Sequence, residues 1–117
     1  MEWWTEDAEE VPGDLDAIFE HLHASHLAFG ESPAAAARLA EERVVAINRA
    51  RFRLVRTPRI GTRHMIGPQE CRQVTMDRAI YWFELHDDRR TIRFLGIFHG
   101  GQDHLGRMMR RLGAGGD

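Results

Sequence analysis

The chain has 117 residues, of which 43% are hydrophobic, so it is long and apolar enough for one domain with one core and too apolar for a disordered tail. No run approaches the roughly 20 consecutive apolar residues of a membrane-spanning helix. The acidic start lacks the apolar segment of a secretory signal. Cys71 is the only cysteine, which excludes an intrachain disulfide and favours a reducing compartment. We therefore expect one cytoplasmic domain, residues 1–117, without membrane association.

Charge is distributed unevenly along the chain, although the formal net charge is only -2. The first 20 residues contain eight acidic side chains and no basic one, whereas the remaining 97 contain ten acidic residues and all 16 arginines. Lysine is absent, so every positive side chain is a guanidinium, which suits phosphate and carboxylate groups; codon bias would produce the same composition. The acidic N-terminal segment, residues 1–11, either screens the basic body or aids solubility.

The first half of the chain predicts two helices. Trp3 and Trp4 are compatible with a short edge strand, after which Asp14 is expected to cap a helix that ends at Gly30. Ser32 is expected to cap a second helix, with Pro33 at its first position. Apolar residues at helical spacing continue towards Val55, and Pro58 stops the pattern. Two helices joined by a short loop predict an antiparallel αα-hairpin.

The second half predicts an antiparallel sheet. Strand-like runs at residues 71–76, 79–86 and 91–99 are separated by connections short enough for hairpins. If these connections set the register, Val74 faces Tyr81, Phe83 faces Phe94 and Leu85 faces Ile92 on the side that we assign to the helices. Asp77-Arg78 is a weak two-residue turn, so a slip of one residue is an alternative. The other face then carries Gln73, Thr75, Ile80, Trp82, Glu84, Arg93, Leu95, Ile97 and His99.

The apolar block on that second face needs a cover, because a monomer does not expose such a patch. Asp103 is expected to cap a short C-terminal helix with an apolar stripe, and residues 113–117 form a flexible tail. Either this helix or a partner protein covers the block. The predicted partner-binding residues are Ile80, Trp82, Leu95, Ile97, Leu105, Met108, Met109 and Leu112.

Four segments carry a resemblance to a known family. The chain resembles the two opening helices of the RelE/ParE toxins at residues 14–19 (DLDAIF) and 32–39 (SPAAAARL). It resembles their proline-glycine-arginine connection at residues 58–63 (PRIGTR). It also resembles their last strand and the following turn at residues 92–103 (IRFLGIFHGGQD). The resemblance covers nearly the whole chain. It implies an α+β fold in which an N-terminal αα-hairpin packs on a small antiparallel sheet, followed by a short C-terminal helix.

The resemblance also implies a function, namely the toxin of a bacterial type II toxin–antitoxin module, neutralised by a cognate antitoxin. ParE-like members of the family bind and poison DNA gyrase, whereas RelE-like members cut mRNA on the ribosome. A third possibility is a toxin that has lost potency and remains an antitoxin-binding partner. We expect an essential target to be bound, with gyrase the choice by family analogy and a ribosome-dependent mRNA endonuclease the alternative.

If the chain were a nuclease, its candidate catalytic residues would be His99 with Arg93, Arg63 and Arg72. RNA cleavage needs an acid, a base and cations for the phosphate. The family's nucleases place an arginine where this chain has Ile80, and the opposing Glu84 competes for Arg93, so the nuclease interpretation is weakened. His99 would then simply bond its own loop. We expect no cofactor and no metal, since the histidines lack a completing ligand set.

Overall fold

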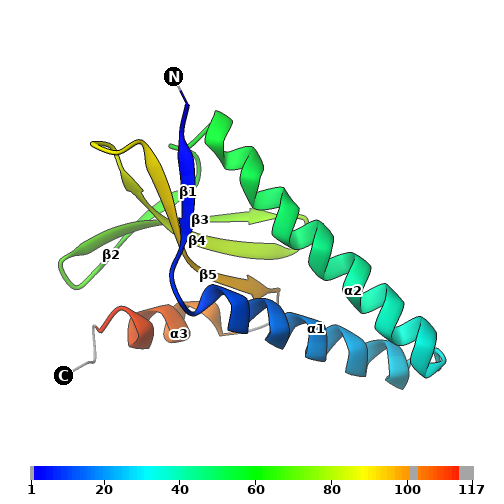
Figure 1. The fold of residues 1–117 in the computed structure, drawn as a ribbon. Coiled ribbons are helices and arrows are strands. Elements are labelled where there is room, and N and C mark those ends of the chain that lie inside the picture. The colour runs from blue at the N-terminus through cyan, green and yellow to red at the C-terminus, as the bar shows by residue number, and fades with distance from the viewer. Residues whose placement is uncertain (1, 101–102, 114–117) are drawn as a thin grey trace.

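The computed structural model describes residues 2–100 and 103–113 (Figure 1). It has the predicted α+β class, with one five-stranded sheet and three α-helices in these ranges. No helix among the described residues is long and apolar enough to cross a membrane. The elements in chain order are β1 (Trp4–Asp7), α1 (Val11–Ala28), α2 (Pro33–Ala50), the 3₁₀ helix η1 (Arg51–Arg56), β2 (Thr62–Ile66), β3 (Gln69–Met76), β4 (Ala79–His86), β5 (Thr91–His99) and α3 (His104–Arg111).

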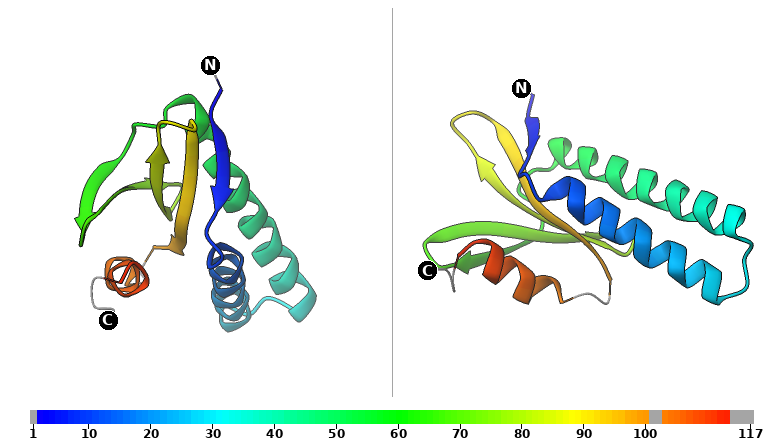
Figure 2. Two further views of the ribbon diagram at one scale, coloured as in Figure 1. Left: turned by 60° about the vertical axis from the view of Figure 1, so that its left-hand side comes forward. Right: turned by 60° about the horizontal axis from the view of Figure 1, so that its bottom comes forward.

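The sheet separates two layers of helices. Its strand order is β1-β5-β4-β3-β2, with β1 parallel to β5 and all other neighbours antiparallel. Helices α1 and α2 lie along one face, and α3 lies on the other (Figure 2). Two apolar clusters result, one between the sheet and the α1–α2 pair and one between the sheet and α3.

Two strands differ from the sequence-based expectation. The helices are not the first elements of the fold, because β1 precedes them. This strand includes Trp4, one of the two tryptophans considered for an edge strand, and it pairs with β5. Strand β2 occupies a stretch that was expected to be a loop. Four of its five residues are exposed or only half-buried, and only Ile66 is buried, so the run lacks the apolar alternation by which strands are recognised.

The helix starts were predicted with mixed success. Ser32 caps α2 as expected, and its hydroxyl accepts the Ala35 N–H at 3.2 Å. The expectation that Asp14 caps α1 is wrong, because the helix begins three residues earlier, at Val11. Val11 is 1% exposed, and its burial against the sheet extends the helix beyond the local signal.

The predicted strand register is correct around the centre of the sheet. Although the Asp77-Arg78 turn has no glycine, both residues adopt positive φ angles, 54° and 69°. Arg43 of α2 holds this turn, with Nη1 donating to Asp77 Oδ2 at 2.9 Å and Nη2 donating to the Asp77 carbonyl. The register therefore does not slip. The confirmed pairs are Val74 with Tyr81, Phe83 with Phe94, Glu84 with Arg93 and Leu85 with Ile92.

A β-bulge changes the register at the end of β5. Phe83 pairs with Phe94 but Trp82 pairs with Gly96, so Leu95 is an extra residue in β5. Beyond it every side chain is on the face opposite to the predicted one. The placement of Ile97 and His99 on the α3 face is therefore wrong: Ile97 packs in the α1–α2 cluster, and Phe98 takes a place beneath α3.

An ion pair with a buried guanidinium attaches β1 to η1. The Arg51 side chain is only 6% exposed, and its guanidinium donates to both carboxylate oxygens of Asp7, with Nη2–Oδ2 at 3.0 Å. The same guanidinium lies over the Phe94 ring, with Cζ 4.9 Å from its centroid. This pairing gives the buried guanidinium a counter-charge and fixes the position of β1 beside β5.

Replacement of Asp7 by alanine should therefore destabilise the fold. The change leaves the Arg51 charge buried without its carboxylate, which costs about 2–3 kcal/mol because Asp7 is partly exposed. Urea unfolding followed by circular dichroism measures the loss. Glu9→Ala, at an exposed neighbouring position, is the control and should change stability by less than about 0.5 kcal/mol. Equal effects of the two changes would contradict this role of the ion pair.

Candidate functional site

Helix α3 covers the apolar block for which the sequence required a cover. Asp103 caps it as expected, accepting the Gly106 N–H at 3.1 Å. Met108 is fully buried against the sheet, whereas Leu105 and Met109 are each 45% exposed. The residues of the sheet beneath it, including Ile80, Trp82 and Leu95, are at most 8% exposed. A partner protein therefore meets this block only if α3 leaves it.

A polar contact anchors the end of α3. The Arg111 guanidinium donates to both oxygens of Asp14 in α1, at 2.8 and 2.9 Å. Asp14 Oδ2 also accepts the Ile97 N–H at 3.0 Å, and Arg111 Nη1 donates to the Leu95 carbonyl at 3.1 Å. The hydrogen bonds that Arg111 donates to Asp14 raise the pKa of Arg111 despite its burial. One carboxylate thus joins α1, the bulged part of β5 and α3.

Gly96 makes room for this contact. A Cβ at this position would lie 2.8 Å from both Arg111 Nη1 and Met108 Sδ. A Cβ atom does not approach other atoms so closely, so any larger residue at position 96 would displace one of the two side chains that hold α3. The chain thus has a glycine next to the bulge, at a position where two α3 side chains lie against β5.

The four candidate catalytic residues do not converge. Arg93 lies on the α3 face, where it is bound by Glu6 at 2.8 Å and faces Glu84 at 3.9 Å. Arg63 and Arg72 pair with each other in the β2–β3 ladder, and their side chains are on the opposite face. Arg72 Nη1 donates to the Arg59 carbonyl at 2.7 Å. The arginines therefore do not surround one phosphate position.

His99 lies on the α1–α2 face, at the far end of β5 from Arg93. Its ring is next to that of His21 in α1, with 5.8 Å between the centroids. Burial, followed by the positive charges of His21, Arg43 and Arg78, lowers the pKa of His99 below its ordinary value. Sequence reasoning identified His99 by its chemistry but missed these neighbours, because they come from three separate segments.

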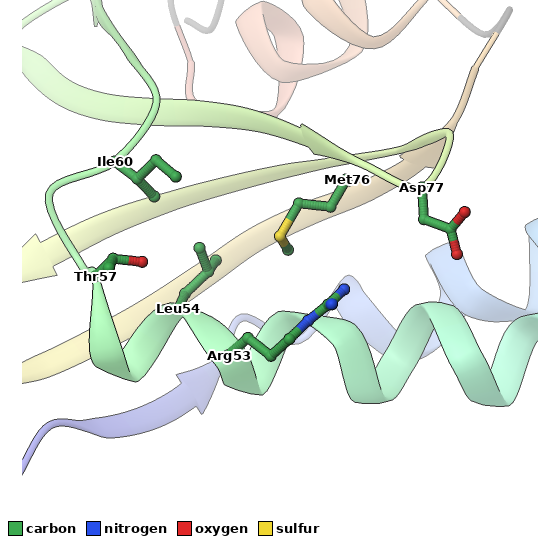
Figure 3. A pocket seen from close by; sticks show the side chains of 6 residues that line it. All are labelled: Arg53, Leu54, Thr57, Ile60, Met76 and Asp77. Atoms are coloured by element: carbon green, nitrogen blue, oxygen red, sulfur yellow. The ribbon is translucent and has the colours of Figure 1, made fainter.

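The surface also contains a pocket of about 490 Å³ between η1 and the end of β3 (Figure 3). Arg53, Thr57 and Asp77 are its polar lining residues, and the remainder are Leu54, Ile60 and Met76. Asp77 is already bound by Arg43, so the pocket lacks a free pair of acid and base. Among the described residues no group of three or more His, Cys, Asp and Glu side chains is arranged to hold a metal ion.

Comparison with known proteins gives similarity at the level of structure. No family model and no curated protein matches the sequence. The fold is similar to a chain of the chromosomal ParDE TA system from P. aeruginosa, with a TM-score of 0.60 and 18% identity over 84% of this chain and 96% of that chain. The chain therefore shares its fold with this chain of a ParDE system. The isolated E. coli RelE toxin matches less well, with a TM-score of 0.44 and 9% identity over 94% of this chain and 98% of that chain.

Cys71 can report whether α3 stays in place. Its thiol is buried in the cluster beneath α3, and burial with the nearby carboxylates of Glu84 and Glu70 raises its pKa to about 11, so it should react slowly with thiol reagents. Arg111→Ala removes the anchor of α3 and should accelerate the reaction at least about tenfold, because about 1.4 kcal/mol of lost attachment suffices. Arg110→Ala, at an exposed position of the same helix, is the control. Identical rates for the two variants would show that α3 does not depend on Asp14.

Proposed function

We propose that this protein is the toxin of a type II toxin–antitoxin module and acts in the cytoplasm. The observation that carries the proposal is the similarity of fold, which extends over 96% of a ParDE chain, together with the quoted sequence segments. The shared fold does not by itself specify a target.

The proposed action is binding of an essential target, with DNA gyrase the choice by analogy with ParE. The arrangement of the charged residues supports binding over RNA cleavage. Arg93 is neutralised by Glu6 and Glu84, and His99 lies on the other face of the sheet. Arg93 and His99 therefore cannot hold the same phosphodiester.

The cognate antitoxin is proposed to occupy the site of α3. This helix is only eight residues long, and Met108 is its one fully buried side chain in the described part. The face beneath it is broad and apolar, formed by Ile80, Trp82 and Leu95 among others. An amphipathic segment of the antitoxin would bury the same face, with Leu105, Met108, Met109 and Leu112 displaced from it.

The target is tested by expression of the protein in cells and by a gyrase assay. Induction should arrest growth, and the purified protein should inhibit DNA supercoiling by gyrase at micromolar concentration. His99→Ala and Arg93→Ala should retain the inhibition, because neither residue belongs to a converging catalytic set. Uninhibited gyrase together with mRNA cuts that disappear in His99→Ala would favour the endonuclease alternative and overturn the proposal.

The antitoxin site is tested by binding of the antitoxin, expected from a small adjacent gene. Met108→Ala weakens the hold of α3 while leaving the sheet intact, at a cost of about 2 kcal/mol. If the antitoxin replaces α3, its affinity should rise up to about 30-fold. Arg107→Ala, at an exposed position, should leave the affinity unchanged. Weaker binding by Met108→Ala would instead place α3 itself in the interface.

A further inference from the structure

A second pocket lies on the face of the sheet opposite α3. It has a volume of about 570 Å³ and opens between α1, α2 and the turn that joins β3 to β4. His21 of α1, Arg43 of α2, Arg78 of the turn and His99 of β5 line it. None of these four residues contacts the anchor of α3, so the pocket is separate from the proposed antitoxin site.

The charge of this pocket favours an anion. His21, Arg43, Arg78 and His99 all line the pocket, and burial, followed by the first three of these residues, lowers the pKa of His99. Asp77 is the one carboxylate among the described lining residues, and Arg43 already binds it at 2.9 Å. An anion would thus meet two imidazoles and the Arg78 guanidinium with little competition. The guanidinium is a strong donor to phosphate oxygens, and an imidazole N–H can donate to them as well.

The turn that presents Arg78 is held rigidly. Arg43 binds both the carboxylate and the carbonyl of Asp77, and the Arg78 carbonyl accepts the Gly100 N–H at 2.9 Å. Arg78 itself is exposed at the mouth of the pocket with φ 69°. A fixed backbone lowers the entropy cost of placing the guanidinium against a ligand.

The other side of the pocket is apolar and aromatic. Phe29, at the end of α1, is 85% exposed and lines the pocket together with Leu22 and Leu39. An exposed phenyl ring beside a cationic site is suited to stacking against a nucleobase, which contributes about 1–3 kcal/mol. The pocket therefore offers a charged end for a phosphate and an aromatic end for a base.

We propose that this pocket binds a nucleoside monophosphate, with the phosphate between His21, Arg78 and His99 and the base against Phe29. This site goes beyond the toxin function and does not depend on it, since a toxin that acts through its other face would not need it. The residues that face His99 and carry or can carry charge are His21 and His26 from α1, Arg43 from α2, and Asp77 and Arg78 from the turn.

The site is tested by calorimetric titration of the full chain with AMP, inorganic phosphate and adenosine at pH 6.5. AMP should bind at least about tenfold more tightly than phosphate, and adenosine more weakly than AMP. Arg78→Gln should weaken AMP at least tenfold, and its exposed position keeps the fold intact. Phe29→Ala should weaken AMP but not phosphate. Arg38→Gln, at an exposed position of α2, is the matched control and should bind normally.

Proton NMR of the histidine rings supplies a second readout. Without ligand, His99 should titrate below about 6.5, the ordinary value for histidine, because burial and its positive neighbours favour the neutral ring. Bound phosphate should raise this pKa, since a negative charge favours the protonated ring. Absence of binding by AMP at millimolar concentration, or equal affinities of wild type and Arg78→Gln, would overturn the site. Equal affinities for AMP and phosphate would overturn the nucleoside part.

Discussion

The carboxylate of Asp14 is the contact on which the arrangement of the two layers depends. It accepts hydrogen bonds from a helix on one side of the sheet, Arg111 in α3, and from the backbone of the sheet itself, Ile97 in β5. Strand β1 pairs with β5 only as far as Phe94, and Ile97, which lies beyond that point, donates its N–H to Asp14. Gly96, next to the bulge, leaves the space that the Arg111 and Met108 side chains occupy.

The uneven charge along the chain has a structural explanation. Glu6, Asp7 and Asp14, all near the N-terminus, are bound respectively to arginines of the β4–β5 hairpin, of η1 and of α3. These three of the eight acidic residues in the first 20 therefore supply specific counter-charges. Two of them bind guanidiniums that are largely buried and would be costly without a partner.

Short sequence patterns predicted the strand register near the centre of the sheet and the start of one helix. Hairpin lengths and apolar alternation gave the register of β3 and β4, and Ser32 marked the start of α2 correctly. The prediction of side-chain orientation is wrong beyond Leu95, the extra residue of the bulge. A bulge cannot be recognised from the apolar alternation, and it reverses the orientation of every side chain that follows. The local sequence around Asp14 is typical of a helix cap, but in the structure Asp14 lies within α1 and accepts the Ile97 N–H.

The same distinction applies to the candidate sites. Residue type identified His99 as a group with acid–base chemistry, and the apolar stripe of the last helix identified Met108 as a residue of a covered face. The neighbours of His99 could not be found in this way, because they are contributed by two helices and a turn. Which distant segments come together depends on the topology of the fold, and it cannot be predicted from a short stretch of sequence.

The parallel pairing of β1 with β5 also sets the order of assembly during synthesis. Glu6 and Arg93, which meet across these strands, are 87 positions apart. The α1–α2 pair can form from local contacts, but the first strand has nothing to join until almost the entire chain has been translated. Closure of the sheet is thus a late event, and a nascent chain stopped before β5 would leave β1 without a partner strand.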